Sequence, residues 1–406
     1  MASFTFRCSE CGARYGEREV RYVCPACAPA QRPGSPTRGV LEVVLDERPP
    51  LPAAPANDPA TLARLLPIAS AASLPPLPVG GSPLLPVPGL RRHLGMPNLW
   101  VKDDTRNPSG STKDRASQLV VAKAGEYGYD TIACASTGNA ATALACLAAA
   151  AGIRAVVLVP AAAPPAKLVQ IAAYGATLVA VDGTYDQAFE LCAQACERFD
   201  WYNRNTAFNP FTIEGKKTVA VEIAAQLAPE RADAVIVPVG DGVIVSGAAK
   251  GFADVLDAPP RLLAVQPDGS GVLARALIAG AREITASSAA SSVADSLVVN
   301  APRNAAMALE RVRASGGTGV LVPDAAIVSA ITLLARTCGV FAEPAGAAAL
   351  AGLLAALSLG LVARDERVVL LVTGSGLKDI GAAQAAVALP RPVAPEIDAV
   401  AALFPG

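Results

Sequence analysis

Hydrophobic positions in most of this chain occur in short continuous runs and seldom alternate with polar ones. From about residue 98 to residue 390, runs rich in β-branched residues are separated by longer stretches rich in alanine and leucine. Strands that are buried on both faces of a parallel sheet have this continuously apolar character. The pattern predicts strands at 98–103, 131–136, 154–160, 176–183, 233–240, 261–269 and 367–376.

Stretches of helical character lie between these runs. Strands that alternate with helices on this scale predict an open α/β fold. A Ser-Thr-Gly-Asn run begins one predicted helix, and a Gly-Asp-Gly turn precedes another, so both helix starts are candidate positions for ligand groups. The predicted helices include 136–152, 164–175, 184–199, 213–228 and 329–339.

Two segments of different composition precede this region. Residues 1–48 contain four of the nine cysteines. Residues 49 to about 88 are rich in proline and alanine, which favours extended chain with little packing. We assign 49–75 to a linker and expect the end of the proline-rich stretch to wrap onto the main body.

Charge and composition exclude several classes of function. The 34 basic and 35 acidic residues nearly cancel, so we expect no binding of nucleic acid or of an anionic membrane. No apolar stretch reaches the roughly 20 residues of a membrane span, and the N-terminus lacks the pattern of a signal peptide. Cysteines without a secretion signal indicate a reducing compartment, so the expected location is the cytoplasm. The single histidine excludes a histidine-rich metal centre built from one chain.

The N-terminal cysteines form two CxxC pairs. Cys8 and Cys11 are separated by twelve residues from Cys24 and Cys27, a spacing that can bring four thiolates to one tetrahedral Zn²⁺. Four protein ligands leave no open coordination position, so the predicted zinc site is structural. The alternative is four free cysteines in a disordered leader. The other five cysteines are expected in the core.

The stretch NPSGSTKDR (107–115) places Lys113 behind small residues. It is not a nucleotide-binding P-loop, because the Gly-Lys-Ser/Thr order of that loop is absent. A lysine that forms a Schiff base must present a neutral amine to an aldehyde, and small neighbours let a flat cofactor approach the backbone. Alone, such a lysine is weak evidence for covalent chemistry.

Three further stretches strengthen this interpretation. ACASTGNAAT (133–142) could hold a carboxylate at a helix N-terminus, although a plain helix cap needs no ligand. VPVGDGVIVSG (237–247) has a glycine turn whose amides could bind a phosphate. LLVTGSGLKD (370–379) ends a predicted buried strand with hydroxyl groups that could contact a heterocyclic nitrogen.

Together these stretches resemble the fold-type-II pyridoxal-phosphate (PLP) enzymes, and among them most closely the threonine synthase family, over about residues 75–385. The family's NPTGSFKDR appears here as NPSGSTKDR, its STGN is present, its TGHGLKD appears as TGSGLKD, and FAEPAGAAALAGL (341–353) is similar to its EPA segment. The resemblance implies two open, mainly parallel α/β domains after the zinc-ribbon-like extension, and a homodimer. The expected division is 1–48 for the zinc-ribbon-like module with its four cysteines, 49–75 for the linker, 76–126 with 211–390 for the larger PLP-binding domain, 127–210 for the smaller domain and 391–406 for a C-terminal tail.

The resemblance also implies the roles of individual residues. Lys113 would carry PLP as a Schiff base and transfer protons, with Asn139 on the 3′-oxygen of the cofactor and Thr373 on its ring nitrogen. The cofactor phosphate would contact the turn formed by Gly240, Asp241, Gly242, Val243 and Ile244. The substrate-binding residues would be Ser136, Thr137, Gly138 and Thr212.

Three positions depart from the family pattern. Thr212 replaces an arginine that would bind the substrate phosphate, Ala140 replaces a threonine, and Asp241 places an acid in the phosphate turn. Lys216, Lys217 and Arg204 are the candidates to replace the missing cation.

The resulting hypothesis is a threonine synthase that converts O-phospho-L-homoserine and water to L-threonine and phosphate. A second hypothesis keeps PLP and an amino-acid substrate but changes the reaction to β-elimination (serine/threonine dehydratase or diaminopropionate ammonia-lyase type) or β-replacement (cysteate synthase type). A third hypothesis is a zinc-ribbon binding protein with an inert α/β body.

Overall fold

The seven predicted strands are all present in the structure, a computed structural model that describes residues 3–32, 34–163 and 165–404. Pro164, the first residue of the predicted helix 164–175, lies outside these ranges. The predicted runs form β5 (Leu99–Asp103), β6 (Thr131–Ala135), β7 (Arg154–Pro160), β8 (Thr177–Val181), β10 (Ala234–Pro238), β11 (Arg261–Pro267) and β13 (Val368–Val372).

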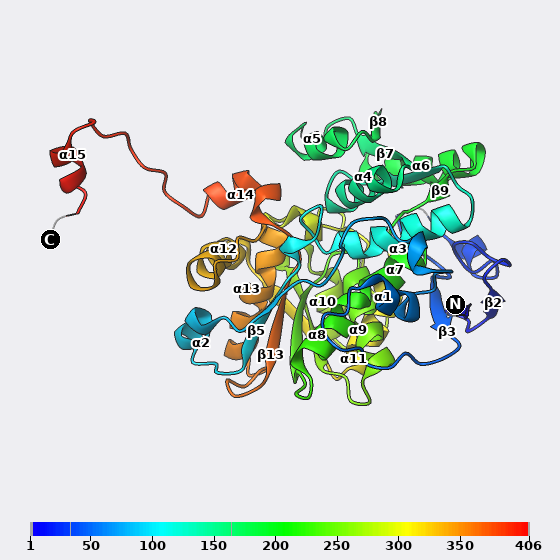
Figure 1. The fold of residues 1–406 in the computed structure, drawn as a ribbon, viewed down its shortest axis with the longest axis horizontal. Coiled ribbons are helices and arrows are strands. Elements are labelled where there is room, and N and C mark those ends of the chain that lie inside the picture. The colour runs from blue at the N-terminus through cyan, green and yellow to red at the C-terminus, as the bar shows by residue number, and fades with distance from the viewer. Residues whose placement is uncertain (1–2, 33, 164, 405–406) are drawn as a thin grey trace.

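The larger of two α/β sheets has the order β12-β11-β10-β13-β5-β4 (Figure 1). Its strands are parallel except at one edge, where β4 (Leu84–Leu85) pairs antiparallel with β5. The strand β12 (Thr318–Val322) was not predicted, because its run of apolar residues is only three long after a glycine-rich turn. Consecutive residues of β10 face two different apolar clusters, so both faces of this sheet are buried as predicted.

The smaller sheet is parallel and has the order β8-β7-β6-β9, with β9 at Tyr202–Asn203. The chain enters it from the larger sheet through β6 and returns through β9, so the two α/β regions are joined by two crossings. A third, antiparallel sheet is formed by β1 (Phe4–Cys8), β2 (Arg14–Gly16) and β3 (Leu41–Leu45) of the cysteine region.

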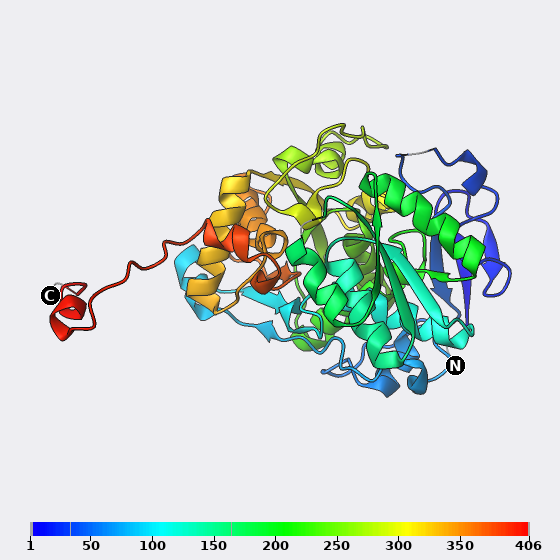
Figure 2. The same cartoon turned by 90° about the horizontal axis from the view of Figure 1, so that it is seen from above.

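Helices cover both α/β sheets (Figures 1 and 2). The predicted helix 213–228 is divided at Lys217, which keeps helical dihedral angles. The α-helices are α1 (Pro59–Leu65), α2 (Pro88–Leu94), α3 (Lys113–Glu126), α4 (Asn139–Ala151), α5 (Pro165–Ala173), α6 (Tyr185–Phe199), α7 (Phe211–Lys216), α8 (Thr218–Leu227), α9 (Val243–Val255), α10 (Val272–Ile278), α11 (Ala305–Ala314), α12 (Asp324–Cys338), α13 (Pro344–Ser358), α14 (Ile380–Gln384) and α15 (Ile397–Ala401). Short 3-10 helices lie at Ala28–Ala30, Ala71–Ser73, Asp104–Arg106, Asp268–Ser270, Asp295–Leu297 and Gly376–Lys378.

Small residues let the central helix α13 lie close to the larger sheet. A Cβ atom on Gly352 would be 2.2 Å from a methyl group of Val265 in β11, so the helix could not pack at this distance with a larger residue. The alanine-rich composition that the sequence shows at 344–356 therefore has a packing reason.

The ends of the chain differ in how they pack. The proline-rich stretch packs more closely than expected, because Leu62, Leu65 and Leu66 are buried in the main apolar cluster. The C-terminal tail leaves the body in both views and ends near the short helix α15 (Figures 1 and 2). Among the described residues, no helix is both long enough and apolar enough to cross a membrane.

Candidate active site

Lys113 is the first residue of α3, and backbone hydrogen bonds fix the loop in front of it. The amide of Thr112 donates to the carbonyl of Thr373 at 2.8 Å, and the amide of Ser375 donates to the carbonyl of Gly110 at 3.0 Å. Gly110 has a φ of +85°, which glycine adopts without strain. The two stretches NPSGST and TGSG, far apart in the chain, therefore lie side by side next to Lys113.

The two charged residues after Lys113 serve the structure. The carboxylate of Asp114 accepts from the amide of Ser109 at 2.7 Å, which holds the preceding loop against the helix. The guanidinium of Arg115 binds Asp104 at 2.8 Å and Glu222 at 2.7 Å. Lys102 also reaches Glu222, at 2.6 Å. These buried ion pairs join α3 to α8 and to the end of β5, so they hold Lys113 at a fixed place.

A cavity of about 480 Å³ opens in front of Lys113, between the two α/β regions. It brings together residues from three of the motifs that the sequence analysis selected. The predicted site residues that line it are Lys113, Ser136, Thr137, Gly138, Asn139, Gly240, Asp241, Gly242 and Ile244.

The remaining predicted site residues lie elsewhere. The hydroxyl of Thr212 donates to the carbonyl of Asn209 at 2.7 Å, and Thr212 is fully buried outside the cavity lining. Val243 is buried in an apolar cluster behind the turn. Thr373 lies beside Lys113 through its backbone contact with Thr112, without lining the cavity.

The glycine turn at 239–244 meets the N-terminus of α9. Gly242 has a φ of +90°, and a Cβ atom there would be 2.8 Å from Ala308, so only glycine fits this close approach. Amides in the first turn of a helix have no partner within the helix, which makes this end of α9 a place for an anion. Gly240 and Ile244 line the cavity at this end.

Asp241, the acid in this turn, is held by its neighbours. Its carboxylate accepts from the amide of Val243 at 3.0 Å and from the hydroxyl of Thr206 at 2.5 Å. Burial alone would raise the pKa of Asp241, but the charges of Lys216 and Lys113 lower it below its usual value. The negative charge is therefore offset within the site, and one turn amide, that of Val243, is already used.

Three buried cations line the same cavity. Arg204 and Lys216 are each 1% exposed, and Arg303 is 5% exposed. The Nη2 atom of Arg204 has no hydrogen-bond partner. Lys216 makes no hydrogen bond or ion pair with any residue that the structure describes, and burial lowers its pKa well below the usual value. Arg303 pairs with Asp186, but Lys216 and the Nη2 atom of Arg204 have no partner among the described residues, which indicates that the cavity takes up an anion.

The structure distinguishes between the three candidates for the missing cation, because Arg204 and Lys216 line the cavity and Lys217 does not. Lys217 points away from the cavity and pairs with Glu214 at 2.5 Å and Asp254 at 2.9 Å. Arg303 lies in a loop before α11, in a sequence without a recognisable motif. Sequence reasoning missed it for that reason.

Asn139 lies between this cavity and a neighbouring one of about 350 Å³. Its Nδ2 donates to the carboxylate of Glu343 at 2.8 Å. Burial raises the pKa of Glu343, although this hydrogen bond and the charge of Lys378 oppose the shift. Glu343, from the EPA segment, therefore fixes the orientation of the Asn139 amide, and a role for it could be anticipated only from the family resemblance.

The amine of Lys113 is suited to bond an aldehyde. Burial lowers its pKa, while the charges of Asp241 and Glu343 raise it in part. A lowered pKa increases the fraction of neutral amine, the form that attacks a carbonyl carbon. The reactive amine, the amides at the N-terminus of α9 and the unpartnered cations together fit PLP, which carries an aldehyde and a phosphate.

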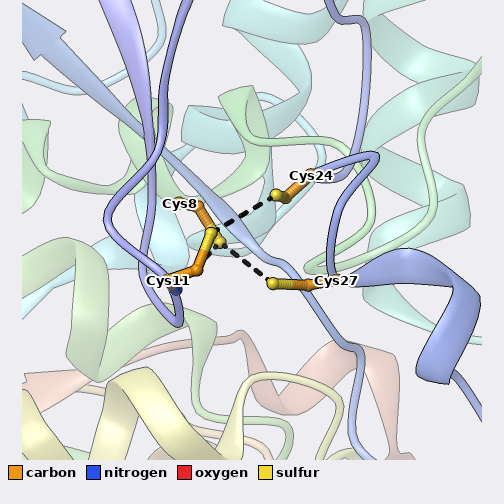
Figure 3. Close-up of side chains that lie close together, drawn as sticks. All are labelled: Cys8, Cys11, Cys24 and Cys27. Atoms are coloured by element: carbon orange, nitrogen blue, oxygen red, sulfur yellow. Dashed lines mark hydrogen bonds between the residues drawn. The ribbon is translucent and has the colours of Figure 1, made fainter.

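The four N-terminal thiols meet at one point (Figure 3). All four sulfur atoms lie within 4.8 Å of one another. The distances are 3.9 Å between Cys8 and Cys27 and 3.7 Å between Cys11 and Cys24. Four Zn–S bonds of about 2.3 Å in a tetrahedron place sulfur atoms about 3.8 Å apart, so this group has the size of a tetrahedral metal site.

Comparison with known proteins agrees with this site. Residues 76–374 match the family model described as "Pyridoxal-phosphate dependent enzyme", so the chain is a member of the PLP-dependent enzymes. A solved structure of diaminopropionate ammonia lyase from Escherichia coli, at 18% identity, has a TM-score of 0.66 over 84% of this chain and 95% of that one, which shows the shared fold alone.

Closer relatives define the branch of the family. A threonine synthase of Methanosarcina acetivorans is 36% identical over 389 residues, which cover 93% of this chain and 92% of the relative. A threonine synthase of Methanocaldococcus jannaschii is 35% identical over 396 residues, with 93% of each chain covered. The chain belongs to the threonine synthase family.

Proposed function

We propose that this protein is a threonine synthase that converts O-phospho-L-homoserine and water to L-threonine and phosphate, with PLP attached to Lys113. The observation that carries the proposal is the desolvated amine of Lys113 at one end of a cavity with unpartnered buried cations. The relatives that match nearly the whole chain support the same reaction.

Five residues hold the cofactor in this proposal. The amides of Gly240, Gly242 and Ile244 at the start of α9 receive its phosphate. Asn139 donates its remaining amide hydrogen to the 3′-oxygen, because Glu343 already accepts the other. The hydroxyl of Thr373, which lies beside Lys113 outside the cavity lining, would contact the ring nitrogen. Bound PLP withdraws electrons from the α-carbon of an amino acid attached to it.

Lys113 moves the protons. With substrate bound, the neutral Nζ of Lys113 would take the proton from Cα of the substrate and would then assist loss of one proton at Cβ. Phosphate would then leave from Cγ, the two protons would return to Cγ and Cα, and water would add its hydroxyl group at Cβ and give its other proton to phosphate, which yields threonine. Ser136, Thr137 and Gly138 bind the substrate carboxylate at the N-terminus of α4, next to Asn139.

The phosphate of the substrate takes the place of an ion-pair partner for the buried cations. Arg204 and Lys216 would be its main contacts, since both are buried without an ion-pair partner among the described residues and Nη2 of Arg204 has no hydrogen-bond partner. Arg204 and Lys216 would therefore replace the phosphate-binding arginine that the family pattern has at position 212. Thr212 itself keeps its hydrogen bond to Asn209.

The β-eliminase hypothesis uses the same cofactor and predicts different products. Incubation of the holoenzyme with O-phosphohomoserine should release phosphate and threonine in equal amounts. L-Serine, L-threonine, diaminopropionate and phosphoserine with sulfite are the comparison substrates. Formation of a 2-oxo acid and ammonia, or of cysteate, with no threonine from O-phosphohomoserine, would rule out the proposal.

The four cysteines would hold Zn²⁺ in a structural role. Four sulfur ligands leave no position open for a substrate or a water molecule, so the metal would take no part in the reaction. Family likeness supports a homodimer, and nine cysteines without a disulfide among the described residues support a location in the cytoplasm. Metal content, measured by elemental analysis of the purified protein, tests the first of these assignments.

A further inference from the structure

The cysteine region packs against the parts of the chain that line the cavity. We define the cysteine module as residues 3–32 with 34–48. Tyr22 of this module accepts a hydrogen bond at its hydroxyl oxygen from the amide of Asn203, at 2.9 Å. Its ring stacks on Phe208 with centroids 5.0 Å apart. Asn203 and Phe208 lie on either side of Arg204 in the sequence, so the module holds the segment that carries this cation.

A second contact reaches Arg303. The amide of Thr37 donates to the carbonyl of Arg303 at 2.9 Å, and Nη1 of Arg303 donates to the carbonyl of Ser35 at 3.1 Å. The other end of the guanidinium binds Asp186 at 2.5 Å and lies 4.6 Å from the ring of Phe189. Arg303 thus joins the module to α6 of the smaller α/β region across the wall of the cavity.

A third contact lies behind the phosphate turn. Val40 of the module is 4% exposed and belongs to a small apolar cluster whose other members are Ala207, Ile213, Val243 and Met307. Val243 is the first residue of α9, and Ala207 follows the Arg204 segment. One valine of the module therefore supports both elements that line the anion-binding end of the cavity.

The segment that makes the last two contacts is fixed by the cysteines. The amide of Cys24 donates to the carbonyl of Gly39 at 2.8 Å, and Val40 bridges to Val23. Gly39 has a φ of +64°, and a Cβ atom there would be 2.9 Å from the Cβ of Cys24. The position of residues 35–40 therefore follows the position of the four sulfur atoms.

We propose that the cysteine module is a built-in support of the anion-binding wall of the active site, with Tyr22 and Val40 as positioning residues for Arg204 and the phosphate turn. The module touches no reacting atom in this account. It acts by holding in place groups that have lost their solvation, where a displacement of about 1 Å is costly to binding. The inference rests on the proposed function only for the identity of the substrate.

Two matched variants test this inference through the affinity for PLP. Val40→Ala and Val43→Ala remove the same two methyl groups from buried positions of the module, but Val43 belongs to the main apolar cluster and not to the one behind the turn. Both variants should lower Tm. Val40→Ala should weaken PLP binding to the apoenzyme on the order of tenfold, whereas Val43→Ala should leave it within about twofold.

A second pair keeps the test decisive if Val40→Ala fails to fold. Tyr22→Phe removes the acceptor for the Asn203 amide, whereas Tyr127→Phe removes a hydroxyl that bonds Glu17 at 2.9 Å within the same interface. Tyr22→Phe should raise KM for O-phosphohomoserine more than it lowers kcat, and Tyr127→Phe should change neither.

Equal changes in PLP affinity within the valine pair, equal changes in KM within the tyrosine pair, or no change of either in any variant that has a lowered Tm, would overturn the inference and leave the module as a source of stability alone. The measurement of PLP affinity does not depend on which reaction the enzyme catalyses. If the predicted PLP pattern holds and no threonine forms from O-phosphohomoserine, the support role stands and the proposed function fails.

Discussion

Two groups of buried charges lie on either side of α3, and they differ in whether their charges are paired. The group around Arg115 includes Asp104, Glu222 and Lys102, each no more than 1% exposed, and every one of them has an ion-pair partner. The group around the cavity contains Arg204 and Lys216, which are as deeply buried but lack such partners among the described residues.

Whether its buried charges are paired indicates whether a group stabilises the fold or serves the active site. Burial of a charge costs several kcal/mol unless a partner and hydrogen bonds compensate for it. The Arg115 group meets this condition within the protein, so its role is to hold α3 in place. The cavity group does not: Asp241 offsets only part of its positive charge, and a bound anion would supply the rest. Lys113 and Arg115 lie two residues apart in the same motif, and only their contacts distinguish their roles.

The largest expected effect concerns Lys113, the reactive member of the cavity group. Lys113→Ala should lower turnover by at least about 10³-fold, because it removes both the attachment point of PLP and the group that moves protons. The fold should be retained, since Lys113 is outside the paired network. Turnover and circular dichroism of the variant measure the two effects. A variant with near-normal turnover would contradict the role of Lys113.

Exchanging each buried arginine for methionine sharpens the comparison. Arg115→Met should lower the free energy of unfolding by about 3–5 kcal/mol, because Asp104 and Glu222 lose their partner. Arg204→Met should change stability by less than about 1 kcal/mol, yet raise KM for O-phosphohomoserine on the order of 10²-fold. Denaturant unfolding and steady-state kinetics on both variants check the prediction. Equal losses of stability in the two variants would contradict the distinction between the paired and the unpaired group.

The paired group should also respond to acid. Burial alone would raise the pKa of Asp104, but the charge of Arg115 and the hydrogen bonds it donates lower that pKa to about 2, from a usual value of 3.8. The stability that Asp104 contributes is therefore present above pH 3.8 and is lost as the pH falls through about 2. In Arg115→Met, acid unfolding should begin at a higher pH than in the wild-type protein. The same onset in both would argue against the pairing.

The four N-terminal thiols form a third group, whose size fits a metal ion. Cys11→Ser should release the bound metal and lower Tm, because a structural site with three strong ligands binds weakly. We expect PLP affinity to fall about tenfold through the displaced wall, while turnover at saturating PLP falls far less than in Lys113→Ala. Metal analysis, PLP titration and kinetics test this. A loss of turnover as large as that of Lys113→Ala would exclude a structural role for the site.

The smallest expected effect concerns the acid within the cavity group. Because the charge of Asp241 raises the pKa of Lys113, Asp241→Asn should lower that pKa further. The pH midpoint for attachment of PLP should then move to lower pH, since neutral amine is available at lower pH. PLP uptake measured across a pH series checks the direction, and a shift to higher pH would be inconsistent with it.

Much of the fold could be predicted from the sequence. The continuous apolar runs define strands because a two-sided sheet leaves no polar face, and all seven predicted strands are present. The CxxC spacing likewise predicts a local cluster, and the four sulfur atoms do meet. Such features depend on residues close together in the chain. β12 was missed because its apolar run is too short to stand out.

The cation set could not be assigned from the sequence. Arg204, Lys216 and Lys217 are near one another in the chain, but helix geometry directs Lys216 into the cavity and Lys217 toward Asp254. Arg303 joins the site only through tertiary contacts with the cysteine module and α6. Pairing of buried charges depends on residues more than a hundred positions apart, such as Arg115 and Glu222, and no local pattern reports it.

The most direct test of the account is to find which lysine carries the cofactor. Both Lys113 and Lys216 line the cavity, and burial lowers the pKa of each. Reduction of the holoenzyme with borohydride fixes PLP to its lysine, and peptide mapping by mass spectrometry locates the label. The account predicts the pyridoxyl group on Lys113 alone. A label on Lys216, or no label on any lysine, would contradict it.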